Sequence, residues 1–461
     1  MTMNNSLESG KEPKSHIHLA AIILLLFGLA YAFLVPIFQA PDEPAHFARA
    51  YGVAEGQYIL RDHPPELIRL ILSSLSTSYD IENYPIFRDI REQMESSASR
   101  VPNVAYNSSQ YSFIPYVFHA AITRLVMGVA DPPQDIIISI YACRVATTII
   151  YCLIFYLAVS IAPFCTWPVF WVMVTPMALS QSAVVSIDVL IFCCGLLVLC
   201  LGLGLEKVKS FICICFTAVF LLLVSKPPYA PLIIGLAVGS MMQGMYKWKK
   251  MITIGAACLI ALGAGYLWQQ TVISEGIYDH TFSYIHSYIS EDISPSAQFN
   301  RLSHNPFLFG LVMTHTILEQ GGRLGHEFVG VLGWQDLEIP MSAVWGWALL
   351  LPVAVLASGC PVHVQGPQRF VLGGSYIVSG ILTIASVLLV LYLVWMPVGA
   401  PYVLAQGRYF HLPVLAALLG LSVIIPRAWR IRKGTCLKVL LLAMGAGINM
   451  SAILAVLHRY W

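Results

Sequence analysis

The sequence predicts an all-α integral membrane protein with about eleven transmembrane helices and further helices at the membrane surface. Two observations lead to this fold class. Hydrophobic residues make up 57% of the 461 residues and charged residues only 11%, whereas a soluble globular chain carries about 25% charged residues. The apolar residues also gather in long uncharged runs, which suit a hydrocarbon core about 30 Å thick.

The first apolar run covers 18–38, and its stretch 19–35 carries no charge. This run is longer than the apolar region of a secretory signal, and no small-residue cleavage site follows it. We therefore interpret it as a retained first span after a cytoplasmic tail at 1–17. Ten further spans are expected at about 137–160, 165–182, 188–205, 210–225, 229–245, 251–270, 342–358, 370–395, 409–426 and 437–457.

Two weaker apolar stretches, 112–130 and 306–320, are predicted not to cross the membrane. If neither stretch crosses, the basic turns all lie on the cytoplasmic side, as the positive-inside rule requires. These turns contain Lys207 and Lys209, then Lys247, Lys249 and Lys250, and finally Arg427, Arg430, Arg432 and Lys433. The N-terminus is then cytoplasmic and the C-terminus external. The loops at about 39–136 and 271–341 are also external, and 112–130 is apolar enough to lie in the interface plane.

The net charge of +2 gives no indication of nucleic-acid binding. The 11 cysteines lie in or beside apolar runs, and they form no CxxC or Cys/His metal pattern. Because cysteine behaves as a small hydrophobe in such surroundings, we expect these residues to be apolar filler.

Two adjacent carboxylates, Asp42 and Glu43, follow the first span and stand between Pro41 and Pro44. The prolines fix the local backbone. A carboxylate at an apolar boundary can be tuned toward general-base catalysis by partial desolvation. Alternatively, the acid pair is solvated and caps the helix that starts near Pro44.

Other charged residues occur at the same predicted membrane face. Asp188 and Lys226 lie at the external ends of spans, where they could also be a helix N-cap and a snorkelling lysine. Arg144 lies a few residues inside the second span, where a cation needs a polar cavity or a partner such as Asp135 or Asp188.

Two more arginines lie in glycine-containing external segments, Arg323 after a Gly-Gly pair and Arg408 after Gly407. The planar guanidinium group suits phosphate. Acids and cations from distant segments thus gather at one face, which fits an interfacial active site better than a transport path with polar groups near the midplane. The sequence requires no metal, although the set Asp42, Glu43 and Asp188 could bind a divalent ion if these side chains converge.

Five motifs occur in the order PDEPAHFARAYGVAEG (41–56), SxDxL (186–190), SKPPY (225–229), GxxGW (330–334) and QGRYFHLP (406–413). Together they resemble bacterial membrane-protein family 2142 of the domains of unknown function, over about residues 20–425. PDEP and QGRY are the most specific of these motifs.

That family is similar to the GT-C glycosyltransferases, multi-span enzymes that use lipid-phosphate sugar donors. The resemblance implies one GT-C-like membrane domain at 18–461, a polyprenyl-phosphate sugar donor, and a glycan or lipid acceptor. It implies that an acid after the first span is the base, that arginine or lysine contacts the donor phosphate, and that 112–130 is an interface helix. The expected catalytic residues are Asp42 and Glu43. The expected substrate-binding residues are His46, Arg49, Arg144, Asp188, Lys226, Tyr229, Arg323, Gln406, Arg408 and Tyr409.

The sequence therefore leads to the hypothesis of a membrane glycosyltransferase for cell-envelope polysaccharide biosynthesis at the external face of the bacterial cytoplasmic (inner) membrane. Two other hypotheses remain. A lipid-linked sugar flippase would show polar residues along a path through the spans, whose middles are mostly apolar. A non-catalytic envelope-assembly subunit would tolerate the loss of Asp42 without loss of product.

The predicted topology can be tested with single cysteines and a membrane-impermeant thiol reagent. A cysteine at position 248, within a basic turn, should react only from the cytoplasmic side. A cysteine at position 85, within the first large loop, should react from outside. Reaction of both positions from the same side would contradict the eleven-span topology.

Overall fold

Helices form nearly all the regular structure of the protein. The computed structural model describes residues 14–59, 108–131, 133–204, 208–242, 246–277, 292–359, 366–430 and 435–461, together with positions 67, 70, 71, 290 and 364. Predictions about other residues, such as most of the cytoplasmic tail, Lys207 and position 85, lie outside the described part of the chain.

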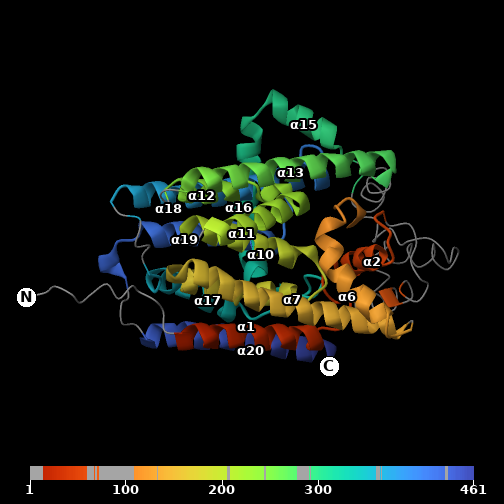
Figure 1. The fold of residues 1–461 in the computed structure, drawn as a ribbon, viewed down its shortest axis with the longest axis horizontal. Helices are drawn as coiled ribbons and strands as arrows, with labels where there is room; N and C mark the ends of the chain where they lie inside the picture. Colours follow the sequence, from red (N-terminus) through yellow and green to blue (C-terminus); the bar gives the residue numbers. More distant parts are fainter. Residues whose placement is uncertain are drawn as a thin grey trace, which may run out of the picture.

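The α-helices follow one another along the chain with few strands between them (Figure 1). They are α1 (Lys14–Leu34), α2 (Glu43–Ala54), α6 (Val117–Met127), α7 (Gln134–Ile161), α8 (Thr166–Met173), α9 (Pro176–Ser182), α10 (Ile187–Leu203), α11 (Val208–Ser225), α12 (Leu232–Met242), α13 (Lys247–Ser274), α15 (Pro295–His304), α16 (Phe307–Gly330), α17 (Met341–Leu356), α18 (Gln368–Trp395), α19 (His411–Ile424) and α20 (Thr435–Tyr460). The 3-10 helices are η2 (Ile114–Tyr116), η3 (Pro163–Cys165), η4 (Pro227–Tyr229), η6 (Gly407–Phe410) and η7 (Arg427–Trp429).

Six of the described helices are long and apolar enough to cross a membrane. They are α1, α7, α13, α18, α20 and the continuous helix formed by η6 and α19. An α-helix rises about 1.5 Å per residue, so their lengths of 18 to 28 residues are comparable with a hydrocarbon core of about 30 Å. The prediction of a helical membrane protein with several apolar spans is therefore confirmed.

The other predicted spans correspond to shorter or interrupted apolar helices. The range 165–182 divides into α8 and α9, because Pro176 lacks the amide hydrogen that would continue the first helix. Thr175 caps the new helix by accepting a hydrogen bond from the backbone N of Ala178 at 3.2 Å. Helices α9 and α10 meet at 114°, so a sharp turn separates Gln181 from Asp188.

Helices α1 and α20 lie side by side and run in the same direction (Figure 1). Where both helices end, the indole Nε1 of Trp461 donates to the carbonyl of Leu34 at 2.9 Å. Near their first residues, His16 and Lys438 both contact the ring of Trp167. The beginnings of the two helices are therefore at one end of the bundle and their last residues at the other.

Helix α2 is packed beside α6 at the bundle end where α1 finishes (Figure 1). All residues of α2 from Glu43 to Gly52 are buried, and Phe47 and Tyr51 belong to a small apolar core with Phe38. This helix and α6 correspond to the helices predicted in the first external loop. Neither is among the helices long enough to span a membrane.

A short antiparallel hairpin follows α16, with β1 (Val331–Leu332) paired to β2 (Leu337–Glu338). Its turn needs Gly333, whose φ of +62° is a left-handed conformation that glycine adopts easily. Next to it, Trp334 Nε1 donates to the carbonyl of Phe38 at 3.1 Å. The GxxGW motif therefore connects the second large loop to the turn that follows α1.

Candidate functional site

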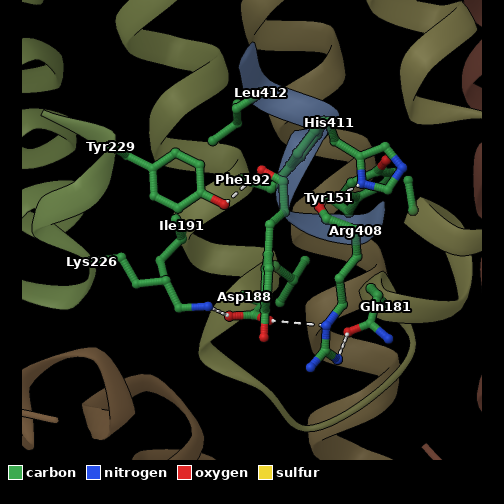
Figure 2. A pocket seen from close by; sticks show the side chains of 13 residues that line it. Tyr151, Gln181, Asp188, Ile191, Phe192, Lys226, Tyr229, Arg408, His411 and Leu412 are labelled. Atoms are coloured by element: carbon green, nitrogen blue, oxygen red, sulfur yellow. Dashed lines mark hydrogen bonds and ion pairs between the residues drawn. The ribbon is translucent and has the colours of Figure 1, made fainter. Parts of the chain in front are cut away.

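Four charged side chains from separate segments form a continuous series at the bundle end beside α2. We name this series the acid–base chain. Asp42 precedes α2, Arg408 lies in η6, Asp188 lies in the first turn of α10, and Lys226 follows α11. Figure 2 shows three of these side chains, with Asp188 between Lys226 and Arg408. The sequence predicted all four, and the tertiary structure brings them into contact.

Asp42 adopts an unusual backbone conformation with its side chain half exposed. Its φ of 65° is left-handed, which is uncommon for residues other than glycine but tolerated by aspartate. It occupies the N-cap position of α2 without making a side-chain capping hydrogen bond. Its Oδ2 instead pairs with Nη2 of Arg408 at 2.5 Å, and its side chain is 53% exposed. The structure therefore gives this carboxylate an ion-pair role rather than the alternative capping role.

Arg408 is oriented by contacts on both sides of η6. Its Nη1 donates to Oε1 of Gln181 at 3.3 Å. The preceding residue, Gly407, donates its backbone N–H to Oε2 of Glu327 at 2.8 Å. A Cβ at position 407 would lie 2.4 Å from the backbone N of Phe328, so only glycine allows this approach. Gln181 and Glu327 were not predicted as site residues, since in the sequence each is simply a polar residue within or beside an apolar run.

Asp188 bridges the two cations of the acid–base chain. Its Oδ1 pairs with Nζ of Lys226 at 2.5 Å, and its Oδ2 lies 3.9 Å from Nε of Arg408. Ser186 provides the N-cap of α10 by accepting from the backbone N of Asp188. The Asp188 carboxylate therefore does not cap the helix, and it pairs with both Lys226 and Arg408.

Two aromatic residues predicted for the site complete its apolar side. The Tyr409 ring lies 4.9 Å from the Lys226 ammonium, in cation–π geometry. The Tyr229 hydroxyl donates to the Tyr409 carbonyl at 3.0 Å. Beneath them is a cavity of about 40 Å³, which suits a water molecule rather than a sugar. It is lined by Tyr151, Ala178, Gln181, Asp188, Val189, Ile191, Phe192, Lys226, Tyr229, Arg408, Tyr409, His411 and Leu412 (Figure 2).

Glu43, the second predicted catalytic acid, is fully buried and faces away from the acid–base chain. Its two oxygens accept from Nε and Nη2 of Arg144 at 2.7 and 2.5 Å. They also accept from the backbone N atoms of Phe38 and Val185, each at 3.1 Å. Arg144 is likewise 0% exposed. Its partner is Glu43, rather than either aspartate considered from the sequence.

His46 lies one helical turn after Asp42 and is buried. Its Nδ1 is 2.7 Å from the hydroxyl of Tyr116. Burial lowers the pKa of His46, against the opposing effect of Asp188 and Asp42. Its imidazole is therefore mainly neutral at pH 7.

Two other predicted residues border the site without joining the acid–base chain. Arg323 forms an ion pair with Glu327 and donates to the carbonyl of Ala405 at 2.9 Å. Gln406 is the N-cap residue of η6, but its side chain makes no capping hydrogen bond. Arg323 thus supports the segment that carries Arg408.

The three acids proposed for a divalent ion do not converge. Asp42 and Asp188 face Arg408, while Glu43 faces Arg144. Within the described ranges, no group of three or more histidine, cysteine or acidic residues has a geometry that could hold a metal ion.

The fold and this site define a helical membrane protein with a compact charged cluster at one end of its bundle. The chain belongs to the family described as "Predicted membrane protein (DUF2142)", whose sequence profile matches residues 25–418. Neither the curated proteins nor the solved structures include a match to the chain.

The buried Glu43–Arg144 pair should be essential for stability. Glu43→Gln leaves the Arg144 guanidinium buried without a carboxylate, and breaking a buried pair in this way costs about 3–5 kcal/mol. We expect a clear fall in the thermal unfolding temperature of the purified protein. Glu55→Gln, which changes an exposed acid just after the same helix, should leave that temperature unchanged. Equal unfolding temperatures for Glu43→Gln and wild type would contradict a structural role.

Proposed function

We propose that this protein is a GT-C type glycosyltransferase, which moves a sugar from a polyprenyl-phosphate donor to a cell-envelope glycan or lipid acceptor. The acid–base chain is the observation that carries the proposal. It places a half-exposed carboxylate, Asp42, in direct contact with Arg408, and it holds Lys226 nearby through Asp188. Sugar transfer from a lipid phosphate at a membrane surface requires a base and phosphate-binding groups close together, and this arrangement occurs at one end of the bundle.

The proposed topology has eleven spans in one domain at 18–461, with the site outside the bacterial cytoplasmic membrane. The parallel direction of α1 and α20 supports an odd number of crossings. The basic turn that begins α13 supports the orientation, since Lys250 contacts Phe211 near the start of α11, whereas Lys226 of the acid–base chain follows the end of that helix. A basic turn and the site thus lie at opposite ends of α11, as the positive-inside rule expects for an external site.

In the proposed reaction the acceptor hydroxyl oxygen attacks the anomeric carbon of the donor sugar. The bond from that carbon to the phosphate oxygen breaks, and its electron pair leaves with the phosphate. Asp42 takes the proton from the acceptor hydroxyl, and Arg408 and Lys226 stabilise the charge of the departing phosphate. A single displacement inverts the configuration at the anomeric carbon. The donor lipid would lie between spans.

The Asp42–Arg408 ion pair gives this reaction an order of events. While this contact persists, the Asp42 carboxylate is occupied by Arg408 and cannot turn toward an acceptor hydroxyl. A donor phosphate competes for the same guanidinium and would release Asp42 toward the acceptor. Arg144 pairs with the inward-facing Glu43 and Arg323 pairs with Glu327, so both lie outside the acid–base chain and are assigned a supporting role.

The donor-phosphate role of Arg408 can be tested by Arg408→Lys, which keeps a charge but loses the bidentate fork. We expect normal membrane insertion and greatly reduced transfer of labelled sugar from a polyprenyl-phosphate donor. Arg323→Lys is the matched control, because Arg323 lies outside the acid–base chain, and it should retain more activity. Wild-type transfer by Arg408→Lys would remove Arg408 from the site.

The general-base role of Asp42 can be tested by Asp42→Asn, which preserves size but cannot accept the acceptor's proton. General-base catalysis contributes about 10²–10⁴-fold in rate, so transfer should fall by that factor at equal protein level. The unfolding temperature should change less than in Glu43→Gln, since the Asp42 side chain is half exposed and Arg408 keeps Asp188 as an ion-pair partner. Asp131→Asn, at an exposed residue before α7, should retain full activity.

The Asp42→Asn assay and a proteoliposome assay together separate the proposed enzyme from the two other hypotheses. A non-catalytic assembly subunit would tolerate Asp42→Asn without loss of product. A flippase would move lipid-linked sugar across proteoliposome membranes without forming a new glycosidic bond. Near-normal transfer by Asp42→Asn would end the assignment of this residue as the base.

A further inference from the structure

Arg49, in the middle of α2, is a buried cation whose hydrogen-bonding capacity is largely unused. The residue is 0% exposed. Its Nη2 donates to the carbonyl of Tyr58 at 2.6 Å, whereas Nε and Nη1 are buried and make no hydrogen bond to any residue that the structure describes. Burial lowers the pKa of Arg49 to about 10, so the guanidinium is still protonated at neutral pH.

Arg144 is a buried arginine with a structural role, and its hydrogen-bond donors have partners within the chain. That guanidinium is equally buried, but it pairs with Glu43 through two nitrogens and donates to the carbonyls of Ala32, Val35 and Pro36. No described carboxylate pairs with Arg49 in this way. A buried charge without a counter-ion is strongly unfavourable, so Arg49 has the capacity to bind a further anion.

The surroundings of Arg49 indicate where that anion would come from. The guanidinium lies 6.0 Å from the ring centre of Tyr116 and 5.5 Å from that of Trp268, near the end of α13. Phe113 contacts both Trp268 and the 60% exposed Tyr58. Tryptophan and tyrosine at span ends are typical of the lipid headgroup level. The row of aromatic rings therefore connects Arg49 with the depth at which lipid phosphates lie.

We propose that Arg49 binds the phosphate group of an anionic lipid in a subsite separate from the acid–base chain. The planar guanidinium offers the unused N–H donors that a phosphate accepts, and the aromatic rings form an apolar wall beside them. His46 lies one turn earlier on α2 and is hydrogen-bonded to the Tyr116 hydroxyl. Asp42 and Asp188 both act to raise the pKa of His46, so His46 lies nearer to the acid–base chain. Binding at Arg49 does not depend on the glycosyltransferase proposal.

The experiment uses the full-length protein in an uncharged detergent and measures its thermal unfolding temperature. Dioleoyl phosphatidic acid, dioleoyl phosphatidylcholine and inorganic phosphate are titrated separately. We expect phosphatidic acid to raise the unfolding temperature in a saturable manner and phosphatidylcholine to have little effect. Arg49→Gln should weaken the apparent affinity for phosphatidic acid by about tenfold or more, since charge-assisted hydrogen bonds are lost.

Arg124→Gln is the matched control, because it removes an exposed arginine from the neighbouring helix α6. It should keep the wild-type response, and loss of the response in this variant would overturn the proposal by indicating surface attraction. Arg49→Lys provides a second variant if Arg49→Gln does not fold; it keeps the charge and loses the fork.

The soluble and lipid sources of the phosphate are separated by the inorganic phosphate titration. An Arg49-dependent response to inorganic phosphate would assign the subsite to a free phosphate group. A response to phosphatidic acid alone would assign it to a lipid. An unchanged response in both Arg49 variants, or no response of wild type to either probe, would overturn the proposal.

Discussion

The rest of the site depends on the buried ion pair between Glu43 and Arg144. This contact joins the turn after α1 to the second long helix, and the same carboxylate also accepts from the backbone of Phe38 and Val185. It therefore holds three segments together where α2 begins. Because Glu43 is held inward, the preceding Asp42 adopts its left-handed conformation with its carboxylate beside Arg408. Two neighbouring acids thus have opposite environments, one internal and one open to solvent.

Three buried arginines near this bundle end differ in how completely their charge is compensated. Arg144 has a carboxylate and three backbone carbonyls, which is typical of a structural arginine. Arg408 pairs with Asp42 and shares Asp188 with Lys226, and its Nε makes no hydrogen bond to the described residues. Among the described residues, only the carbonyl of Tyr58 accepts a hydrogen bond from Arg49. Since a buried charge without partners is unfavourable, the capacity to accept an external anion increases in that order.

Much of the site was accessible from the sequence because charged residues at the ends of apolar runs have few alternative locations. Asp42, Asp188, Lys226 and Arg408 were all predicted at one membrane face, and the structure brings them together. The assignment of Glu43 to catalysis and the partner of Arg144 could not be settled in the same way. Sequence proximity to Asp42 gives no information on the direction of a side chain, and the partner of Arg144 lies 101 residues away.

The sequence by itself determined that the chain is a helical membrane protein, because its uncharged runs can satisfy their backbone hydrogen bonds in lipid only as helices. It also determined which polar residues lie at the ends of those helices. Tertiary structure alone decided the pairing of the charges and the anchoring of Arg408 by Gln181 and Glu327. It also decided which groups neutralise or hydrogen-bond to each buried arginine. These features depend on contacts between segments distant in sequence, where the distances and directions of side chains fix the electrostatic energy.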